Sequence, residues 1–287
     1  MKHFSSIGII GLGVIGGSIG LAIQKRALAD RVYGMARSES TLRKALSSGA
    51  IDQGTQEFSS PLTDAHLLIL AAPVSTNLMY VRSLCDYNPH TFFTDVGSTK
   101  REILSEVDKV SGISHNFVGA HPMAGSEQTG FEYASADLFE GKTIFLSKTE
   151  KSSPESVERI ADFWKALGGE IVWIEASRHD TLVAYTSHLP HLVAFALGRS
   201  LRHLADDPDF HKAIGKGFLD TTRISASAGE IWSDIFLLNR DNLLASLRIF
   251  KESLASFEDL VERCENRTLM ELLDEAAQLR RSLKKNG

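Results

Sequence analysis

The sequence is short of several features that would place it in a particular class of protein. It contains two cysteines, Cys85 and Cys264, which lie far apart and have no metal-ligand spacing. They predict neither a disulfide framework nor a metal site, and they fit a reducing cytoplasm. No apolar run approaches the length of a membrane span, and no basic region followed by an apolar core marks a secretion signal. We therefore expect a cytoplasmic protein with no membrane partner.

The net charge is small as well. The 287 residues carry a formal net charge of −5 and the sequence pI is about 6.1, so no strong positive field would recruit nucleic acid. The sequence contains no internal repeat and no low-complexity tract. With 43% hydrophobic and 23% charged residues, it is typical of a globular chain, and it is long enough for two domains.

What the sequence does have is a cluster of glycines near its start. Residues 7–10 indicate a buried strand, and Gly11, Gly13 and Gly16 follow at the spacing G-x-G-x-x-G before an apolar helix. In this context the glycines permit a tight turn, a close approach to a pyrophosphate, and close packing of helix on strand. A turn without a ligand is disfavoured, because so many glycines weaken folding unless they are needed. The residues predicted to contact a dinucleotide here are Gly11, Leu12, Gly13, Val14, Ile15 and Gly16.

The end of the second strand, expected at residues 31–35, indicates which dinucleotide binds. A protein that selects NAD usually places Asp or Glu there, about 20 residues past the glycines, to hold the ribose 2′-hydroxyl. This chain has Ala36, Arg37 and Ser38, which offer a guanidinium and a hydroxyl to a 2′-phosphate and no carboxylate to repel it. We therefore predict NADP in preference to NAD. In the alternative, Arg37 is a solvated turn residue and Glu39 turns toward the ribose.

Strands and helices alternate until about residue 174, and the apolar period then becomes helical. This pattern predicts an α/β fold with an N-terminal Rossmann-type doubly wound sheet over residues 1–174 and an all-helical domain over residues 175–287. Ligands bind at the carboxyl ends of parallel strands, so those ends should flank the cofactor. The residues concerned are Ala72, Pro73 and Val74 after one strand and Gly97 after the next.

A histidine follows a further expected strand. Residues 117–120 place His121 at the carboxyl end of that strand, and Pro122 forbids an α conformation at His121. An imidazole beside a dinucleotide suits a general base, although a partly buried histidine bonded to backbone is the structural alternative. Ser98 and Thr99 are expected to cap the N-terminus of the helix that follows them, over residues 101–110, and Ser98 would also face the cofactor pocket.

Two more histidines mark the helical half. One long apolar helix, or a kinked pair, is expected over residues 180–204, with Pro190 inside it. His188 and His191 are three residues apart, close to one face of such a helix. They could be packed helix residues, bind an anionic substrate or ligate a metal. A metal is the least favoured, because His179 and Asp180 are the only further donors nearby. We therefore expect no metal site.

Asp220 and Arg223 are also three residues apart. This spacing indicates either an ordinary surface ion pair on a helix or an arginine fork for a substrate carboxylate.

A regular apolar seam follows, with alternating steps of four and three residues. Such a seam marks a helix that buries one stripe against another helix. The second helix could belong to the same chain or to a second copy in a symmetric dimer, because one small helical domain has limited core of its own. The seam comprises Leu243, Leu247, Phe250, Leu254, Phe257 and Val261.

Together these motifs resemble those of the prephenate/arogenate dehydrogenase family of tyrosine biosynthesis, over essentially the whole chain. The glycine turn is shared with many oxidoreductases, whereas the later motifs are much more specific to this family. They are Asp95–Lys100, Gly119–Glu127, Ser187–His191 (Ser-His-Leu-Pro-His), and Asp220–Arg223 followed by Ile231 and Trp232.

The resemblance implies an oxidative decarboxylation, which with the NADP predicted above and prephenate as substrate would give 4-hydroxyphenylpyruvate. Hydride leaves the carbinol carbon of a cyclohexadienol ring, carbon dioxide departs and the ring becomes aromatic. By resemblance His121 helps to remove the hydroxyl proton, and Ser98 orients that hydroxyl or His121. The other implied substrate-site residues are Arg223 on a carboxylate, His188 and His191 lining the pocket, Glu127 and Asp220 in a polar network that gates it, and Trp232 reaching in from the partner subunit of a homodimer formed through the helical domain.

Two positions depart from the family's usual pattern. Many members carry Asp at the end of the second strand, where this chain has residues 36–38, and this difference concerns the cofactor and not the reaction. Lys216 stands where relatives usually have a small residue, and it adds a cation near the expected substrate pocket.

Several alternatives in function remain open. Arogenate dehydrogenase, or a dual cyclohexadienyl dehydrogenase, would need to accept a substrate ammonium, and Glu127 is the only carboxylate expected beside His121. A β-hydroxyacid dehydrogenase would carry a catalytic lysine on the first long helix of the second domain, where this chain has His188 and His191. A non-catalytic NADPH sensor would leave His121 and Arg223 idle. Prephenate is therefore preferred as the substrate.

Overall fold

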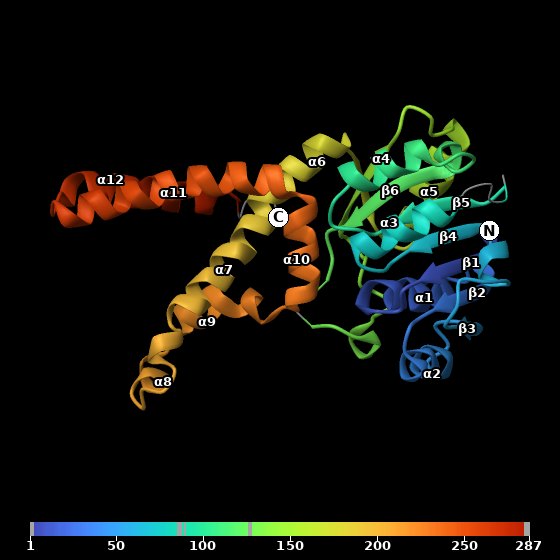
Figure 1. The fold of residues 1–287 in the computed structure, drawn as a ribbon, viewed down its shortest axis with the longest axis horizontal. Coiled ribbons are helices and arrows are strands. Elements are labelled where there is room, and N and C mark those ends of the chain that lie inside the picture. The colour runs from blue at the N-terminus through green and yellow to red at the C-terminus, as the bar shows by residue number, and fades with distance from the viewer. Residues whose placement is uncertain (1–2, 85–87, 89, 126–127, 284–287) are drawn as a thin grey trace. The chain divides into compact units, whose positions relative to one another are not determined.

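The computed structural model describes residues 3–84, 88, 90–125 and 128–283 (Figure 1). The chain divides into two compact units, Met1–Arg240 and Asp241–Gly287. Among the described residues, no helix combines the length and the apolar character needed to cross a membrane. The domain boundary placed after residue 174 stays a prediction.

The first unit contains a sheet of eight described strands in the order β3-β2-β1-β4-β5-β6-β7-β8. Neighbouring strands are parallel except β6 and β7, which are antiparallel. The chain order reverses between β1 and β4, and ligands of doubly wound folds bind beyond the carboxyl ends of the strands at such a point. The α/β fold expected from the sequence is confirmed. The strands are β1 (Phe4–Ile10), β2 (Ala29–Met35), β3 (Gln53–Thr55), β4 (Leu67–Leu70), β5 (Phe92–Asp95), β6 (Phe117–Pro122), β7 (Thr143–Lys148) and β8 (Glu170–Trp173).

Alternate residues of the central strands enter two different cores. Leu67 and Ile69 of β4 lie in one core, and Leu68 and Leu70 lie in the other, because successive side chains of a strand point to opposite faces. Burial on both faces explains why β4 is apolar throughout. The first core includes side chains of α1 (Val14–Arg26), α2 (Glu39–Ser47) and α5 (Pro154–Ala166), and the second includes those of α3 (Val74–Ser83) and α4 (Arg101–Lys109).

After β8 the first unit becomes helical (Figure 1). Residues Ala184–His188 form a π-helical turn, so of the two alternatives expected over residues 180–204 the structure has the pair of helices, and the second helix ends at Ser200. Pro190 lies in the first turn of that second helix, where its missing N–H costs no hydrogen bond. Turns of this kind are frequent at functional sites. The helices are α6 (Ala176–Val183), α7 (Leu189–Ser200), α8 (Phe210–Ala213), α9 (Lys216–Thr222) and α10 (Gly229–Leu238).

The second unit consists of α11 (Arg240–Glu262) and α12 (Asn266–Leu283), of which α12 was not predicted. Within the apolar seam of α11, Leu243 is buried, whereas Leu254 and Val261 are 55% and 62% exposed. Further large apolar side chains are exposed on α12, and apolar surface of this extent usually marks a contact with another protein. They are Met270, Leu273, Leu279 and Leu283.

Candidate active site

The glycine turn between β1 and α1 has the geometry of a dinucleotide site. Gly11 adopts a φ of +97°, and a Cβ there would lie 2.6 Å from the carbonyl oxygen of Ala71. A Cβ on Gly16 would lie 1.9 Å from the carbonyl oxygen of Gly11, so α1 can approach β1 only with glycine at this position. A Cβ on Gly13 would meet no other described atom within 4 Å. Because Gly13 offers α1 no side-chain cap, the first N–H groups of α1 are available to a phosphate, and these residues fit a dinucleotide.

The end of β2 lies beside this turn, because β1 and β2 pair in register up to Ile10 and Met35. The Arg37 side chain is exposed at this end. Glu39 begins α2, and its carboxylate lies 3.9 Å from the guanidinium of Arg43 one turn later. The nearest acidic side chain in the sequence therefore has a cationic partner on its own helix.

The ends of β4 and β5 carry the remaining predicted cofactor contacts, Ala72, Pro73, Val74 and Gly97. Asn77, which the sequence analysis did not single out, fixes the first of these segments. Its side-chain amide donates to the carbonyl of Leu70 at 3.1 Å and accepts from the N–H of Ala72 at 3.2 Å. Gly97 donates its N–H to Asp95 Oδ2 at 2.8 Å. Both loops are thus held in place by hydrogen bonds to side chains of the same chain.

His121 lies half-buried at the carboxyl end of β6. Its Nδ1 is 2.8 Å from Nε2 of His179, and Nδ1 of His179 is 2.7 Å from Oδ1 of Asp180. Burial lowers the pKa of His121 well below the usual 6.5, and the neighbouring His179 and Lys100 lower this pKa further. The imidazole is therefore neutral at pH 7, as a general base requires.

Asp180 comes from α6 but occupies the N-terminus of α4. Its carboxylate accepts the backbone N–H groups of Lys100 at 2.8 Å and of Arg101 at 2.9 Å. The helix α4 begins at Arg101, as expected, but the expected cap by Ser98 and Thr99 is wrong. Lys100 occupies the N-cap position, and the remote carboxylate of Asp180 accepts the first N–H groups. Ser98 lies half-buried at the carboxyl edge of the sheet, outside α4.

Lys100 and Asp95 form a fully buried ion pair at the same edge. Asp95 also accepts the N–H groups of Gly97 and Ala120, so its two oxygens join the end of β5 to β6. Burial lowers the pKa of Lys100 and raises the pKa of Asp95, and the attraction between the two charges opposes both shifts. The ammonium of Lys100 is also near enough to His121 to disfavour a positive charge on that imidazole.

His188 is buried at the end of the π-helical turn, with 1% of its surface exposed. The side-chain amide of Asn239 donates to Nδ1 of His188 at 3.1 Å and to the carbonyl of Asp180 at 2.7 Å. Nδ1 therefore acts as an acceptor, and Nε2 of the neutral ring carries the proton. Burial lowers the pKa of His188 to about 4, against the opposing charge of Asp180. Asn239 was not predicted from the sequence.

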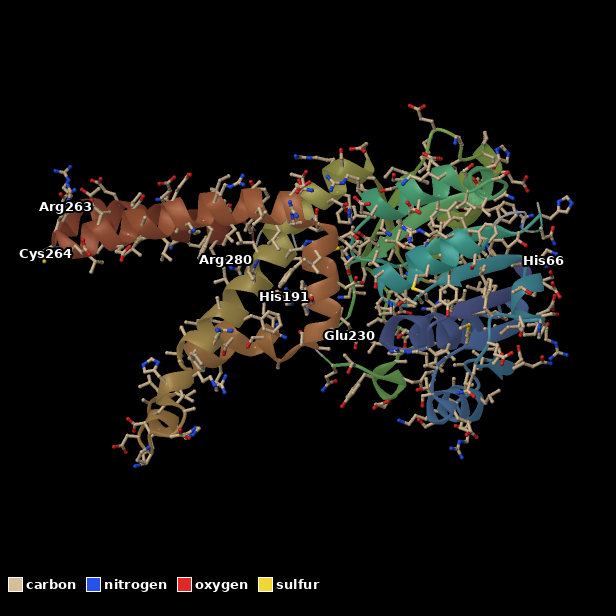
Figure 2. The ribbon with its side chains drawn as sticks, in the orientation of Figure 1. His66, His191, Glu230, Arg263, Cys264 and Arg280 are labelled. Atoms are coloured by element: carbon tan, nitrogen blue, oxygen red, sulfur yellow. The ribbon has the colours of Figure 1, made fainter. Side chains whose placement is uncertain are left out.

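His191 projects from α7 toward α10 (Figure 2). Its ring stacks on the indole of Trp232 in the same chain, with centroids 3.5 Å apart and planes at 19°. Its Nδ1 donates to the carbonyl of Ser187 at 2.9 Å, which leaves Nε2 as an acceptor. Burial lowers the pKa of His191; the bond to Ser187 raises this pKa, and the nearby guanidinium of Arg223 lowers it. Trp232 thus meets His191 without needing to cross from a partner subunit.

Two of the other predicted substrate-site residues are not brought into this cluster. Lys216 and Asp220 are exposed on α9, a helix that packs against α7. Glu127 lies outside the described residues. Within the part of the chain that the structure describes, no three His, Cys, Asp or Glu side chains are grouped as metal ligands.

Three features of the first unit suit one kind of chemistry. They are the turn that fits a dinucleotide, the neutral imidazole of His121 at the end of β6, and the guanidinium of Arg223 near the imidazole of His191. Such groups can remove a proton from a hydroxyl, place a hydride acceptor and bind a carboxylate.

Two family models match the chain. The first, described as the nucleotide-binding domain of prephenate dehydrogenase, matches residues 19–173. The second, described as the dimerization domain of prephenate dehydrogenase, matches residues 175–275. The chain belongs to the prephenate dehydrogenase family. The family expected from the sequence motifs is therefore confirmed, and its nucleotide-binding domain agrees with the glycine turn in indicating a nicotinamide dinucleotide cofactor.

Individual relatives extend this finding. The prephenate dehydrogenase of Bacillus subtilis is 35% identical over 239 residues, which are 82% of this chain but 64% of that protein, slightly under two thirds of its length. The solved prephenate dehydrogenase of Aquifex aeolicus, in complex with hydroxyphenyl propionate and NAD+, has a TM-score of 0.90 at 31% identity and covers 99% of this chain and 98% of its own. The arogenate dehydrogenase of Synechocystis has a TM-score of 0.79 at 28% identity, over 97% of this chain and 99% of its own.

Proposed function

We propose that this member of the prephenate dehydrogenase family is an NADP-dependent enzyme that converts prephenate to 4-hydroxyphenylpyruvate and carbon dioxide. The observation that carries the proposal is the neutral imidazole of His121 at the end of β6, at the same edge of the sheet as the dinucleotide turn. When a carbinol carbon gives up a hydride, a nearby base is needed to accept the proton of its hydroxyl.

The chemistry divides between cofactor and chain. When bound, the nicotinamide accepts the hydride of the carbinol carbon. His121 takes the proton of the ring hydroxyl through Nε2, because its Nδ1 is already engaged with His179. Ser98, half-buried at the same edge, orients the hydroxyl. Carbon dioxide leaves as the ring becomes aromatic, and the proton then returns from Nε2 of His121 to the phenolate oxygen of the product.

The helical residues of the first unit hold the substrate. Arg223 binds a substrate carboxylate, and His188 and His191 line the pocket, with His191 nearer the side chain. The position of the proton on each ring supports a role in substrate binding. Nε2 of His188 carries a proton and can donate, whereas Nε2 of His191 carries a lone pair and can accept. Trp232 holds His191 in place through the stack.

The residues after β2 support NADP. Arg37 is exposed at that end, and Glu39 lies near Arg43 on its own helix, so a 2′-phosphate would meet a guanidinium and no free carboxylate.

Arogenate is the second candidate substrate. The likeness to the Synechocystis arogenate dehydrogenase favours it. The charge near His191 favours prephenate, because Arg223 adds a cation where arogenate would place an ammonium group.

We further propose a homodimer formed through the second unit. The matched dimerization domain and the exposed apolar side chains of α11 and α12 support it. Sedimentation of the purified chain should give twice the mass of 31.5 kDa, and replacing Leu273 and Leu279 with Glu should give the single mass. A stable monomer of the unaltered chain at micromolar concentration would contradict this assembly.

The function is tested by supplying prephenate and arogenate, each with NADP and with NAD, and following the absorbance of the reduced cofactor. We expect the highest kcat/KM for prephenate with NADP, by about tenfold or more over each other combination, which is about 1.4 kcal/mol in the transition state. Turnover of a simple β-hydroxy acid instead would support the rival dehydrogenase class. Tight NADPH binding with no turnover of any substrate would support a sensor.

A further inference from the structure

Two hydrogen bonds connect His121 with His179 and Asp180, two residues that the sequence indicated only as possible metal donors. The first joins Nδ1 of His121 to Nε2 of His179 at 2.8 Å, and the second joins Nδ1 of His179 to Oδ1 of Asp180 at 2.7 Å. His179 and Asp180 are both fully buried, and the ring of Phe145 packs edge-on against His179 with centroids 5.5 Å apart. Each of the two hydrogen bonds therefore has at least one fully buried partner.

Asp180 sets the direction of both hydrogen bonds. Its two oxygens each accept a backbone N–H group at the start of α4, one from Lys100 and one from Arg101. Because Asp180 acts as the acceptor in these bonds, we take Nδ1 of His179 as the donor in the bond between His179 and Asp180. With its one ring proton on Nδ1, His179 has a lone pair on Nε2. The proton of the hydrogen bond between the two rings must therefore be on Nδ1 of His121.

We infer that His179 and Asp180 are positioning residues for His121: they fix the imidazole in the tautomer whose Nε2 lone pair faces the substrate hydroxyl, and they receive its charge during the reaction. This inference rests on the proposed function, because it assigns a role within the same site. The inference assigns His179 and Asp180 a role in the reaction, and no sequence motif connects these two residues with His121.

The proton can be followed through each step. The substrate O–H bond breaks and its proton forms a bond to Nε2 of His121. The Nδ1 proton of His121 moves along the 2.8 Å hydrogen bond to Nε2 of His179, which becomes doubly protonated. The Nδ1–H of His179 stays bonded to Asp180, whose negative charge stabilises the new imidazolium. The excess proton thus moves one residue away from the reacting ring, and the reverse transfers restore the starting state.

Other charged and titratable groups surround these three residues. Asp95 at the end of β5 and Lys100 just before α4 form a buried ion pair, and His188 from the π-helical turn is neutral. Among these groups, Asp180 is the carboxylate that forms a hydrogen bond with His179. A substitution of Asp180 therefore removes the negative charge that the inference requires.

The tautomer can be tested without catalysis, by nitrogen NMR of the whole protein labelled at histidine. We expect a protonated Nδ1 and an unprotonated Nε2 for His121, with the Nδ1 proton at unusually low field. His179→Phe, which keeps a ring of similar shape but offers no acceptor, should abolish this low-field signal. A wild-type spectrum with the proton of His121 on Nε2 would overturn the inference, whatever reaction the protein performs.

The role in turnover is tested with His179→Gln and Asp180→Asn, and with Phe145→Leu as the matched control that loosens the packing on His179 but keeps both hydrogen bonds. We expect kcat to fall about 100-fold in the first two variants, with KM and the Kd for NADP changed less than about threefold. The acid limb of the pH profile of kcat should move to lower pH in Asp180→Asn, by about one unit, because the positive charge on the base loses its counterion.

Phe145→Leu should leave the acid limb unmoved and kcat within about threefold of wild type. A fall in kcat without a moved acid limb in Asp180→Asn, or an equal fall in the control, assigns these residues a structural role only and overturns the inference. If the wild-type protein turns over neither prephenate nor arogenate, the proposed function fails while the NMR result still decides the tautomer.

Discussion

The imidazole of His191 lies flat on the indole of Trp232, with ring centroids 3.5 Å apart and planes at 19°. The two residues come from α7 and α10 of one chain and sit 41 positions apart in the sequence, so the stack ties the two helices together beside Arg223. Nδ1 of His191 donates to the carbonyl of Ser187, four residues earlier. Nε2, on the other side of the ring, therefore points away from the backbone of α7.

Loss of this stack should weaken substrate binding more than chemistry. For Trp232→Leu we expect KM for prephenate to rise about three- to tenfold, which corresponds to the energy of one aromatic pair, with kcat changed less. Trp232→Phe should retain most of the binding. Trp173, 42% exposed on β8, is the matched control, and Trp173→Leu should leave both constants unchanged. A large fall in kcat with unchanged KM in Trp232→Leu would show that the indole acts on the reaction step instead.

The cofactor preference should depend on Arg37. Replacing it with Ala removes a charge-assisted hydrogen bond to the 2′-phosphate, so the Kd for NADP should rise about 10- to 100-fold while that for NAD changes little. Fluorescence titration with each cofactor at fixed ionic strength measures both constants. Arg31, exposed earlier on β2, is the control residue, and Arg31→Ala should alter neither Kd. Equal weakening for NADP and NAD in the Arg37 variant refutes the cofactor argument.

Buried neutral His188 should make the protein sensitive to acid. Burial lowers its pKa to about 4 in the folded chain from the usual 6.5, so the unfolded chain binds this proton first as the pH falls. The stabilisation is complete above pH 6.5 and is lost between pH 6.5 and about 4. Between pH 7.5 and pH 5 this loss amounts to about 2 kcal/mol in the free energy of unfolding.

His188→Gln should lose correspondingly less stability over this interval, because glutamine does not titrate. Urea unfolding of both proteins at the two pH values, at one protein concentration, measures the difference. An identical acid-induced loss in wild type and variant means that His188 is not held neutral in the folded chain.

The sequence predicted the features of this protein that depend on neighbouring residues. The glycine turn follows from three glycines between a strand and a helix, and His121 lies at a strand end because an apolar run precedes it and Pro122 follows. The short strand β3 was missed, because three residues carry too little of the alternating pattern to be recognised. The π-helical turn ending at His188 was missed as well, because one added residue hardly changes a helical apolar period.

The links between distant residues could not be predicted. Ser98 and Thr99 were assigned the cap of α4 because they are among the best local capping residues, yet the carboxylate of Asp180, 80 positions beyond Lys100, satisfies that helix end. The contact between His121 and His179 spans 58 positions. Only the fold brings these residues together, and a sequence read by local spacing contains no signal for either contact.

The central claim is that His121 is the base of the reaction, and His121→Asn tests it most directly. The measurement is steady-state turnover of prephenate with NADP, together with the Kd for NADP, and with His115→Asn as a control at an exposed histidine just before β6. We predict that His121→Asn lowers kcat about 1,000-fold and leaves the Kd for NADP within about twofold of wild type, because asparagine can hydrogen-bond but cannot take the proton. A variant that retains kcat within about tenfold of wild type would contradict the account.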